Sequence, residues 1–261
     1  MSLFSSVVSM TSGVNLIIGL RSLRKDHRPY VLKRAISKFQ RFYTEHFLRP
    51  HFAALGKTPM IFRPWHVEVF GAPIIIGDYV CMIAAADHRV RLSVWTDKQV
   101  SGQIRIGDYS LLCPGVRISS ASQIRIGDNC MIARGAYITD SDWHDVYNRI
   151  AFGKTDPIEI ANNVWIGDGA IVCKGVSIGE NSIVGAGAVV VNTIPPNCIA
   201  AGNPAQVVKR LDPEESFTTR KQWFLKGSNL FYEIDQLDRE LLRENTVLHW
   251  LRYVFFPSKK D

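Results

Sequence analysis

A repeat of six residues between Ile160 and Thr193 limits the possible folds of this chain more than any other feature. Aliphatic side chains open six successive hexapeptides, at positions 160, 166, 172, 178, 184 and 190. The fifth position of each hexapeptide is small or β-branched, and glycine is frequent at the second. A period of six fits neither a helix of 3.6 residues per turn nor the alternation of an ordinary strand. It predicts a hexapeptide solenoid, in which three short strands joined by tight turns form each triangular coil.

The same pattern continues toward the N-terminus with interruptions. The triplet Ile-Gly-Asp recurs at 76–78, 106–108, 126–128 and 166–168, and we expect it to open four coils. The triplets are 30, 20 and 40 residues apart, whereas a bare coil needs about 18 residues. The excess is expected to leave the solenoid as two loops, one over about Asp87–Gln103 and a larger one over about Asp140–Asp156.

The predicted fold is an all-β solenoid over residues 71–210 with N-terminal and C-terminal α-helical extensions. In residues 1–70, apolar side chains recur at helical spacing from Leu32 to Phe47 with basic residues between them, and this helix should stop before Pro50. In residues 211–261, apolar residues at near-heptad spacing predict helix over about 213–256. Because the edges of a solenoid need covering, we expect this segment to cap the C-terminal end.

The basic excess of the chain is confined to one segment. Nine Lys and Arg residues between positions 21 and 49 stand against Asp26 and Glu45, which accounts for the whole net charge of +7. Such a patch attracts lipid head groups, acidic glycans or nucleotide phosphates, or it is simply a solvated helix face. The basic helix, and an aromatic C-terminus that ends in Lys259 and Lys260, are compatible with membrane contact or with packing on protein.

The cysteines and the N-terminus indicate a reducing compartment. Five cysteines lie in strand-like runs without CxxC pairs, and we expect them to be buried free thiols: Cys81, Cys113, Cys130, Cys173 and Cys198. The apolar run Val14–Leu20 is too short and too interrupted for a signal peptide or a membrane span. We therefore expect a cytoplasmic protein, with peripheral contact to the inner face of the membrane as an alternative.

The larger loop contains the strongest candidate for catalysis. His144 is flanked by Asp140, Asp142 and Asp145 at the point where the regular coil breaks. A neutral imidazole can remove a proton at pH 7, while a carboxylate on its other nitrogen fixes the tautomer. We therefore expect His144 to be a general base assisted by Asp142. The two loops also supply candidate substrate-binding residues: His88, Asp140, Trp143 and Tyr147.

A catalytic metal and a phosphate-binding loop find no support in the sequence. Some hexapeptide solenoids are zinc-type carbonic anhydrases, which need three imidazole ligands. Arg149 stands at the spacing from His144 where those enzymes carry a second histidine. The signatures GxxxxGK[ST] and GxGxxG are also missing. No metal and no nucleic-acid partner are expected.

The C-terminal coils resemble the hexapeptide-repeat acetyltransferases over the run NVWIGDGAIVCKGVSIGENSIVGAGAVVVNTIPPNCIAAGNPAQVVKRL. The pattern is most similar to the maltose, galactoside and xenobiotic O-acetyltransferases and to polysaccharide O-acetyltransferases, and the resemblance covers about residues 71–210. It implies a left-handed parallel β-helix that forms a homotrimer and uses acetyl-coenzyme A. It also implies active sites in the grooves between subunits.

The resemblance implies roles for single positions. His144 matches the family's general base, and the backbone N–H of Asp168 matches the donor to the thioester oxygen. The matched coenzyme A contacts are Trp165, Gly167, Ala186, Asn192, Lys209 and Arg210. The chain departs from the family at Val191-Asn192, where a Thr-Lys pair is common, and at Cys113, near which part of the family has a substrate-contacting Asn. The two termini have no counterpart in the small sugar acetyltransferases.

The sequence therefore favours an acetyl-coenzyme A-dependent O-acetyltransferase that modifies a hydroxyl of a sugar, glycan or glycan precursor. One alternative is a membrane-surface acyltransferase that acts on a glycolipid or lipid-linked intermediate. Another is a non-catalytic solenoid scaffold that binds through its flat faces. Acceptor choice is expected to depend on the two loops and the terminal extensions.

Overall fold

The structure, a computed structural model, describes residues 26–96, 100–212, 214–225 and 230–257. The chain divides into two units. One combines the residues up to Ala35 with those from Phe231 onward, and the other runs from Ile36 to Leu230. The expectations for Val14–Leu20 and for Lys259 and Lys260 lie outside the described residues.

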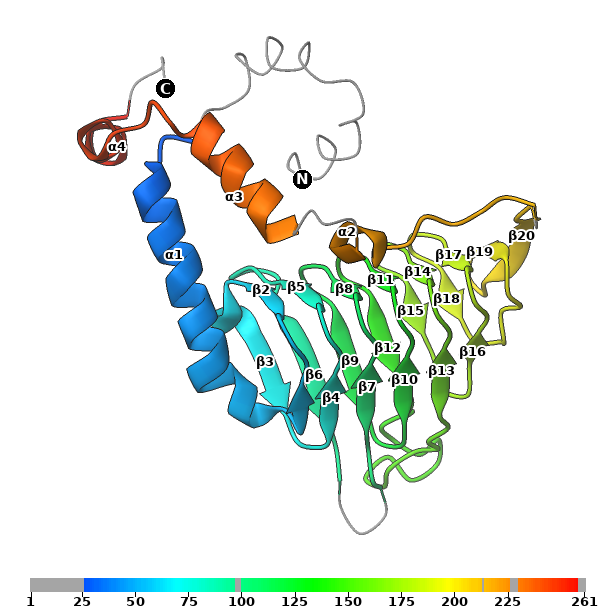
Figure 1. The fold of residues 1–261 in the computed structure, drawn as a ribbon. Helices are drawn as coiled ribbons and strands as arrows, with labels where there is room; N and C mark the ends of the chain where they lie inside the picture. The colour runs from blue at the N-terminus through cyan, green and yellow to red at the C-terminus, as the bar shows by residue number, and fades with distance from the viewer. Residues whose placement is uncertain (1–25, 97–99, 213, 226–229, 258–261) are drawn as a thin grey trace. The chain divides into compact units, whose positions relative to one another are not determined.

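The predicted solenoid is confirmed, because three sheets of short strands enclose one hydrophobic core (Figure 1). Sheet A contains β1 (Ala54–Leu55), β4 (Ile74–Ile76), β7 (Ile104–Ile106), β10 (Ile124–Ile126), β13 (Ile158–Ile160) and β16 (Ser177–Ile178). Sheet B contains β2 (Met60–Phe62), β5 (Cys81–Ile83), β8 (Leu111–Leu112), β11 (Met131–Ile132), β14 (Trp165–Ile166), β17 (Ile183–Val184), β19 (Cys198–Ala201) and β20 (Gln206–Arg210). Sheet C contains β3 (Val67–Phe70), β6 (Val90–Val94), β9 (Arg117–Ser120), β12 (Tyr137–Thr139), β15 (Ile171–Val172) and β18 (Val189–Val190). Neighbouring strands are parallel, except that β20 is antiparallel to β19.

The hexapeptide positions that were expected to point inward form the core. The aliphatic residues that open the six repeats are 0–2% exposed, and those at the fifth position are 0–3% exposed. Equivalent residues of successive coils stand in register, as Ile124 does with Ile104 and Ile158. Each coil therefore continues the same apolar column, and its stability depends on the coils on either side.

The four Ile-Gly-Asp triplets do not occupy equivalent places. The first three end strands of sheet A, whereas the fourth ends β14 of sheet B. In the first three, the aspartate N–H donates to the next coil: Asp78 to Asp108, Asp108 to Asp128, and Asp128 to Asn162, at 2.7–2.8 Å. Asn162 thus holds the place in the fourth coil that we expected Asp168 to hold. After the long loop between the third and fourth triplets, the fourth triplet therefore lies one strand later in the coil, on sheet B instead of sheet A.

Both predicted loops are present, and both leave the solenoid where sheet C passes into sheet A. We call these turns the CA corner, and the turns from sheet B into sheet C the BC corner. β6 occupies much of the range expected for the smaller loop, so the described part of that loop is residues 95–96 and 100–103, and the larger loop spans residues 140–157 (Figure 1). The two loops meet, since the rings of Trp95 and Trp143 lie 5.9 Å apart in an edge contact.

The solenoid begins earlier than predicted, at Ala54 rather than at residue 71. The segment before it contains α1 (Tyr30–Tyr43), the π-helical turn η2 (Thr44–Leu48) and the 3₁₀ helix η3 (Arg49–His51), and η4 (Pro64–His66) lies inside the first coil. Leu48 and Phe52 are 5% and 7% exposed and join the hydrophobic core. They cover the N-terminal end of the solenoid. The predicted helix is confirmed and changes to π-helical geometry before Pro50.

The stretch over residues 214–225 does not cap the C-terminal coil, contrary to the prediction for this part of residues 213–256. It returns to the middle coils, where α2 (Gln222–Leu225) lies beside β8 and β11 (Figure 1). Arg220 Nε donates to the carbonyl of Tyr109 (2.7 Å), and the N–H of Lys221 donates to Asn129 Oδ1 (2.8 Å). Tyr109 and Asn129 have positive φ at the turns from sheet A into sheet B. These two turns therefore supply the acceptors that hold Arg220 and Lys221. The edge of β19 is covered by β20 instead.

In the described C-terminal part of the other unit, two helices stand where one long helical pattern was expected. These are α3 (Leu230–Leu241) and α4 (Val247–Phe255). Thr246 separates them because its hydroxyl accepts the N–H of His249 at 3.2 Å, which caps a new helix. The hydroxyl of Tyr30 donates to the carboxylate of Asp235 at 2.9 Å. Within the described ranges, no helix combines the length and the apolar character that crossing a bilayer requires.

All five cysteines are free, as expected, although Cys113 and Cys173 are only partly buried. Burial raises the pKa of Cys81 and of Cys130 from 9.0 to about 12. A thiol whose pKa is higher in the folded state contributes its full stability below the unfolded pKa. That contribution is lost as the pH rises from 9.0 toward about 12.

We therefore expect the free energy of unfolding to fall with pH above about 9, and less steeply in Cys81→Ala than in the wild type. Urea unfolding at pH 7.5 and at pH 10.5 measures the difference between the two proteins. Lysines and tyrosines titrate in both proteins alike, so the comparison isolates the thiol. Equal pH dependence in wild type and variant would contradict the assignment.

Candidate functional site

The base of the large loop is fixed by Asp140, whose side chain is 0% exposed. Its carboxylate accepts hydrogen bonds from the hydroxyl of Ser120 (2.6 Å) and from the backbone N–H groups of Ala121 (2.7 Å) and Ser122 (2.9 Å). Burial raises the pKa of Asp140, and these three hydrogen bonds to the charged form oppose that shift. We had expected Asp140 near the substrate. The structure makes it the anchor of the loop, because none of its surface is accessible.

His144 lies beyond this anchor in an exposed turn. Its backbone N–H donates to the carbonyl of Asp142 at 2.7 Å, while its imidazole makes no hydrogen bond with any residue that the structure describes. Asp142, expected to assist it, instead binds Lys174 Nζ at 2.7 Å. The Asp145 carboxylate accepts the N–H groups of Asn148 and Tyr147, which lowers its pKa. The flanking aspartates therefore shape the loop and leave the imidazole free to meet a substrate.

Trp143 is partly buried, whereas the tip of the loop is exposed. The Trp143 indole N–H donates to Thr139 Oγ1 (3.0 Å) and to the hydroxyl of Tyr137 (3.2 Å), which holds the loop against sheet C. At the tip, three apolar side chains are 64–97% exposed: Val146, Tyr147 and Ile150. Clustered exposed apolar groups of this kind are typical of a surface that another molecule covers.

Among the unpartnered backbone donors of the BC corner in the described residues, two belong to successive turns beside Trp165. The Gly187 N–H donates to the Asp168 carbonyl at 2.8 Å, which links two successive turns. Among the described residues, the N–H groups of Asp168 and Ala186 have no acceptor. Because backbone donors need a partner, water or a ligand must satisfy them. Trp165, on β14, is 45% exposed beside this corner. Gly167 serves packing, since a Cβ there would lie 2.6 Å from the backbone nitrogen of Ala186.

The structure divides the candidate residues into two groups. The first lies on sheet B and at the BC corner: His88, Trp165, Gly167, Asp168, Ala186, Lys209 and Arg210. The second lies at the CA corner: Asp140, Asp142, Trp143, His144, Tyr147 and Asn192. Strand β15 runs from the Asp168 turn to Lys174, which binds the large loop. Within one chain, the proposed base at the CA corner and the Asp168 N–H at the BC corner are therefore separated by the length of a sheet C strand.

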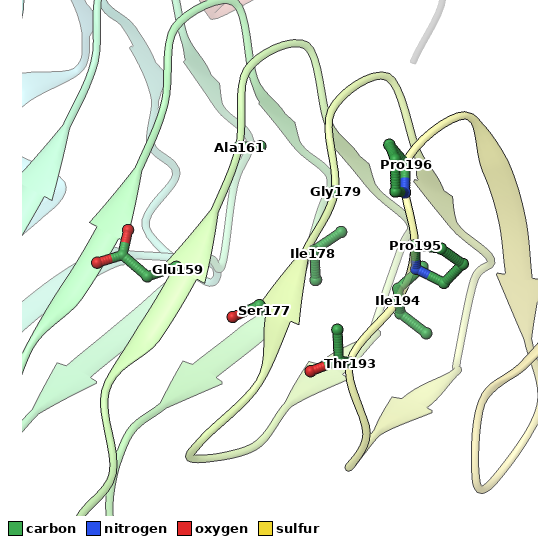
Figure 2. Close-up of a pocket in the computed structure, with 9 residues that line it drawn as sticks. All are labelled: Glu159, Ala161, Ser177, Ile178, Gly179, Thr193, Ile194, Pro195 and Pro196. Carbon is green, nitrogen blue, oxygen red and sulfur yellow. The ribbon is translucent and has the colours of Figure 1, made fainter.

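Two hollows on the described surface of the solenoid lie beside candidate residues. One, of about 350 Å³, lies on sheet A next to Asn192 and has a mostly apolar lining that includes Ile194 and Pro195 (Figure 2). The other, of about 210 Å³, lies at the BC corner and is lined by His88 and by arginines that the sequence reading missed. In the described part of the chain, no three His, Cys, Asp or Glu side chains gather closely enough to bind a metal ion.

Comparison with known proteins decides the family. Residues 157–192 match the family model described as bacterial transferase hexapeptide (six repeats). The galactoside O-acetyltransferase of Escherichia coli K12 is 35% identical over 184 residues, which are 70% of this chain and 76% of that protein. This chain belongs to the hexapeptide-repeat acetyltransferases. The predicted resemblance, and with it membership in an acyltransferase family, is confirmed.

Two further matches to this hexapeptide-repeat acetyltransferase are shorter or more distant. A relative from Saccharomyces cerevisiae is 48% identical over 63 residues, which are 24% of this chain and only 32% of that protein. The crystal structure of an N-acyltransferase from Bacillus cereus, in complex with dTDP and coenzyme A, is 19% identical. It covers 73% of this chain and 96% of its own, with a TM-score of 0.50. The left-handed β-helix predicted for the chain is confirmed by the family and by this fold.

Proposed function

We propose that this hexapeptide-repeat acetyltransferase transfers an acetyl group from acetyl-coenzyme A to a hydroxyl of a sugar, glycan or glycan precursor. The observation that carries the proposal is the exposed imidazole of His144 in a loop anchored by buried Asp140. The Escherichia coli relative is by name a galactoside O-acetyltransferase, which supports a carbohydrate hydroxyl as the acceptor.

In the proposed reaction, His144 removes the proton of the acceptor hydroxyl as that oxygen attacks the carbonyl carbon of the acetyl thioester. The C–S bond breaks, its electron pair leaves with sulfur, and the imidazolium returns the proton so that coenzyme A departs as the thiol. The backbone N–H of Asp168 donates to the carbonyl oxygen, where negative charge develops. The general base supplies about 10²–10⁴-fold of the acceleration, and holding both reactants in one groove supplies more.

We assign the donor substrate to sheet B and the BC corner. Trp165 and Ala186 would line its pantetheine arm, because both are exposed beside the unpartnered N–H groups. Lys209 and Arg210 are exposed on the edge strand β20 and are placed to meet phosphate groups. The apolar hollow of Figure 2 and Asn192 lie on sheet A and at the CA corner, away from these residues, so this path of the donor does not include them.

We further propose that the active form is a homotrimer and that each site needs two copies of the chain. The separation of His144 from Asp168 supports this, because neither corner alone holds both the base and the oxyanion donor. A closed ring of three copies places the CA corner of one copy against the BC corner of the next. The exposed apolar tip of the loop, residues 146–150, is the surface that such a contact would cover.

Ile150→Asp is therefore expected to break the trimer into monomers and to abolish transfer. Ile150 is 97% exposed in the single chain, so an aspartate there leaves the isolated fold intact but places an unpaired charge in the interface. Light scattering measures the mass of the assembly. Leu225→Asp, at an apolar side chain 63% exposed on α2, serves as the control. A trimeric, fully active Ile150→Asp protein would count against the shared site.

The direct test of the proposed function is release of the coenzyme A thiol in the presence of a panel of acceptors. The panel contains free sugars, nucleotide sugars and glycolipids. Turnover confined to one class supports the proposal and identifies the acceptor. Absence of turnover with every class, together with no binding of coenzyme A in calorimetry, would favour the scaffold instead.

Two exposed amphipathic helices favour a membrane-surface enzyme as the second candidate. None of the residues of α1 or α4 is buried. On α4 and directly after it, six apolar side chains are 37–80% exposed: Val247, Leu248, Leu251, Val254, Phe255 and Phe256. Amphipathic helices of this kind bind at a lipid interface. Flotation with anionic liposomes tests this candidate. If the protein stays at the bottom of the gradient at physiological salt, the membrane-surface enzyme is ruled out.

A further inference from the structure

Three arginines surround the hollow of about 210 Å³ at the BC corner. The pocket is lined by Ala86, Asp87, His88, Arg89, Arg91, Gly115 and Arg117. Register places Glu68, Arg91, Arg117 and Tyr137 side by side on β3, β6, β9 and β12. Four residues distant in the sequence thus form one row across the outer face of sheet C.

The arginines of this row are held in place but keep free donors. The carboxylate of Glu68 binds Arg89 Nη1 at 2.5 Å and Arg91 Nε at 2.6 Å. The guanidinium of Arg117 lies over the ring of Tyr137, with its Cζ 4.3 Å from the ring centroid. Among the described residues, neither the Nη atoms of Arg91 nor any guanidinium nitrogen of Arg117 has a hydrogen-bond acceptor. Pre-positioned guanidinium groups with open N–H donors suit a carboxylate or phosphate.

His88 positions a fourth arginine at the same corner. Its Nδ1 lies 2.9 Å from a carboxylate oxygen of Asp87, and its Nε2 lies 2.6 Å from Arg134 Nη2. A guanidinium can only donate, so Nε2 accepts and Nδ1 carries the proton. Both ring nitrogens are thus engaged, and His88 acts as a positioning residue rather than as a base. The four arginines, together with the carboxylates of Glu68 and Asp87 that pair within this cluster, carry a net charge of about +2.

The pocket lies on one side of the proposed reaction centre and the donor lies on the other. The Asp168 turn precedes β15, which is two strands from β9 and three from β6, a separation of roughly 10–14 Å. The proposed path of the pantetheine arm runs from Asp168 to Ala186, toward later coils and away from the pocket. An anion bound at Arg91 and Arg117 therefore belongs to the acceptor, and it lies farther from the reacting hydroxyl than a single sugar ring spans.

We propose that this pocket binds an anionic group of the acceptor, a carboxylate or a phosphate, carried by a sugar residue next to the one that is acetylated. The inference rests on the proposed acetyl transfer and names its substrate class as an acidic glycan. Arg91 and Arg117 are its specificity-determining residues.

The test compares Arg117→Gln with wild type on two matched acceptor pairs. The first pair is a disaccharide that contains one uronic acid and its methyl ester, and the second is a disaccharide phosphate and its neutral parent. Removal of a charge-assisted hydrogen bond is expected to raise the KM for the acidic acceptors about 10–100-fold. The KM for acetyl-coenzyme A and for the neutral acceptors should stay within about twofold. Arg125→Gln is the control, because Arg125 is an exposed strand arginine on β10, 3.6 Å from Glu159.

Each outcome bears on the proposal. A larger effect in the uronic acid pair or in the phosphate pair identifies which anion the acceptor carries. If Arg117→Gln instead raises the KM for acetyl-coenzyme A, the arginines hold the donor and the proposal is overturned. Dissociation of the trimer in light scattering would make them interface residues and overturn it equally. Wild-type protein that acetylates neutral and acidic acceptors alike keeps the proposed function and rejects only the acidic pocket, whereas no turnover at all rejects both.

Discussion

His144→Ala is expected to lower kcat about 10²–10⁴-fold, because the acceptor hydroxyl loses the group that takes its proton. The affinity for coenzyme A should not change, since the donor is assigned to sheet B and the BC corner. Stability should also be unaffected, because the His144 ring is exposed and makes no hydrogen bond with the described residues. Thiol release at saturating acetyl-coenzyme A measures kcat, and calorimetry measures coenzyme A binding.

Two further variants sharpen this measurement. His51→Ala removes another exposed imidazole, on η3 and far along the chain from the loop, and should leave kcat unchanged. Asp142→Asn breaks the ion pair with Lys174 but no contact with the imidazole, so its effect should be much smaller than that of His144→Ala. If His144→Ala lowers kcat by less than about tenfold, the base lies elsewhere and the loop only positions the acceptor.

The coils could be predicted from the sequence because their stabilising contacts repeat locally. Every sixth residue from Ile160 to Val190 faces the core, and each packs against the same position of the next coil. The first coil was missed because residues 54–70 lack an Ile-Gly-Asp triplet. The return of the C-terminal segment to Tyr109 and Asn129 was missed for another reason. It depends on a carbonyl and an amide presented by turns about 100 residues earlier, which no local pattern encodes.

The site could be predicted in part, for related reasons. His144 stood out because a loop interrupts the repeat around it, and the structure leaves its ring exposed. Asp140 carries the same side chain as Asp142 and Asp145 in the same loop, and only its three hydrogen bonds reveal that it is the anchor. Arg91 and Arg117 look in the sequence like ordinary outward-facing strand residues. They form one pocket because two coils stack, which brings together positions that the first loop separates.

The division of the candidate residues between two corners leads to the second large expected effect, which is recovery of activity in mixed trimers. His144→Ala removes the base at the CA corner. Ala186→Trp fills the donor groove at the BC corner, where Ala186 is exposed and has an unpartnered N–H. Each variant alone should be almost inactive. Co-expression of the two with different affinity tags, followed by purification on both tags, yields trimers that contain both chains.

We assume that each site takes its base from one copy and its donor groove from the next. A mixed trimer then contains a site that combines His144 of the Ala186→Trp chain with the donor groove of the His144→Ala chain. Every closed ring of three that contains both chains has one intact site, so about one third of the sites in the doubly purified protein should be intact, and activity should rise far above that of either variant. A site contained within one chain cannot be repaired by mixing, because every chain carries one lesion. The double variant His144→Ala with Ala186→Trp, mixed with His144→Ala, is the control that must stay inactive. Recovery in the first mixture and not in the second requires that His144 acts in the groove of a neighbouring copy. We expect this result because His144 and Asp168 of one chain are separated by the length of a sheet C strand.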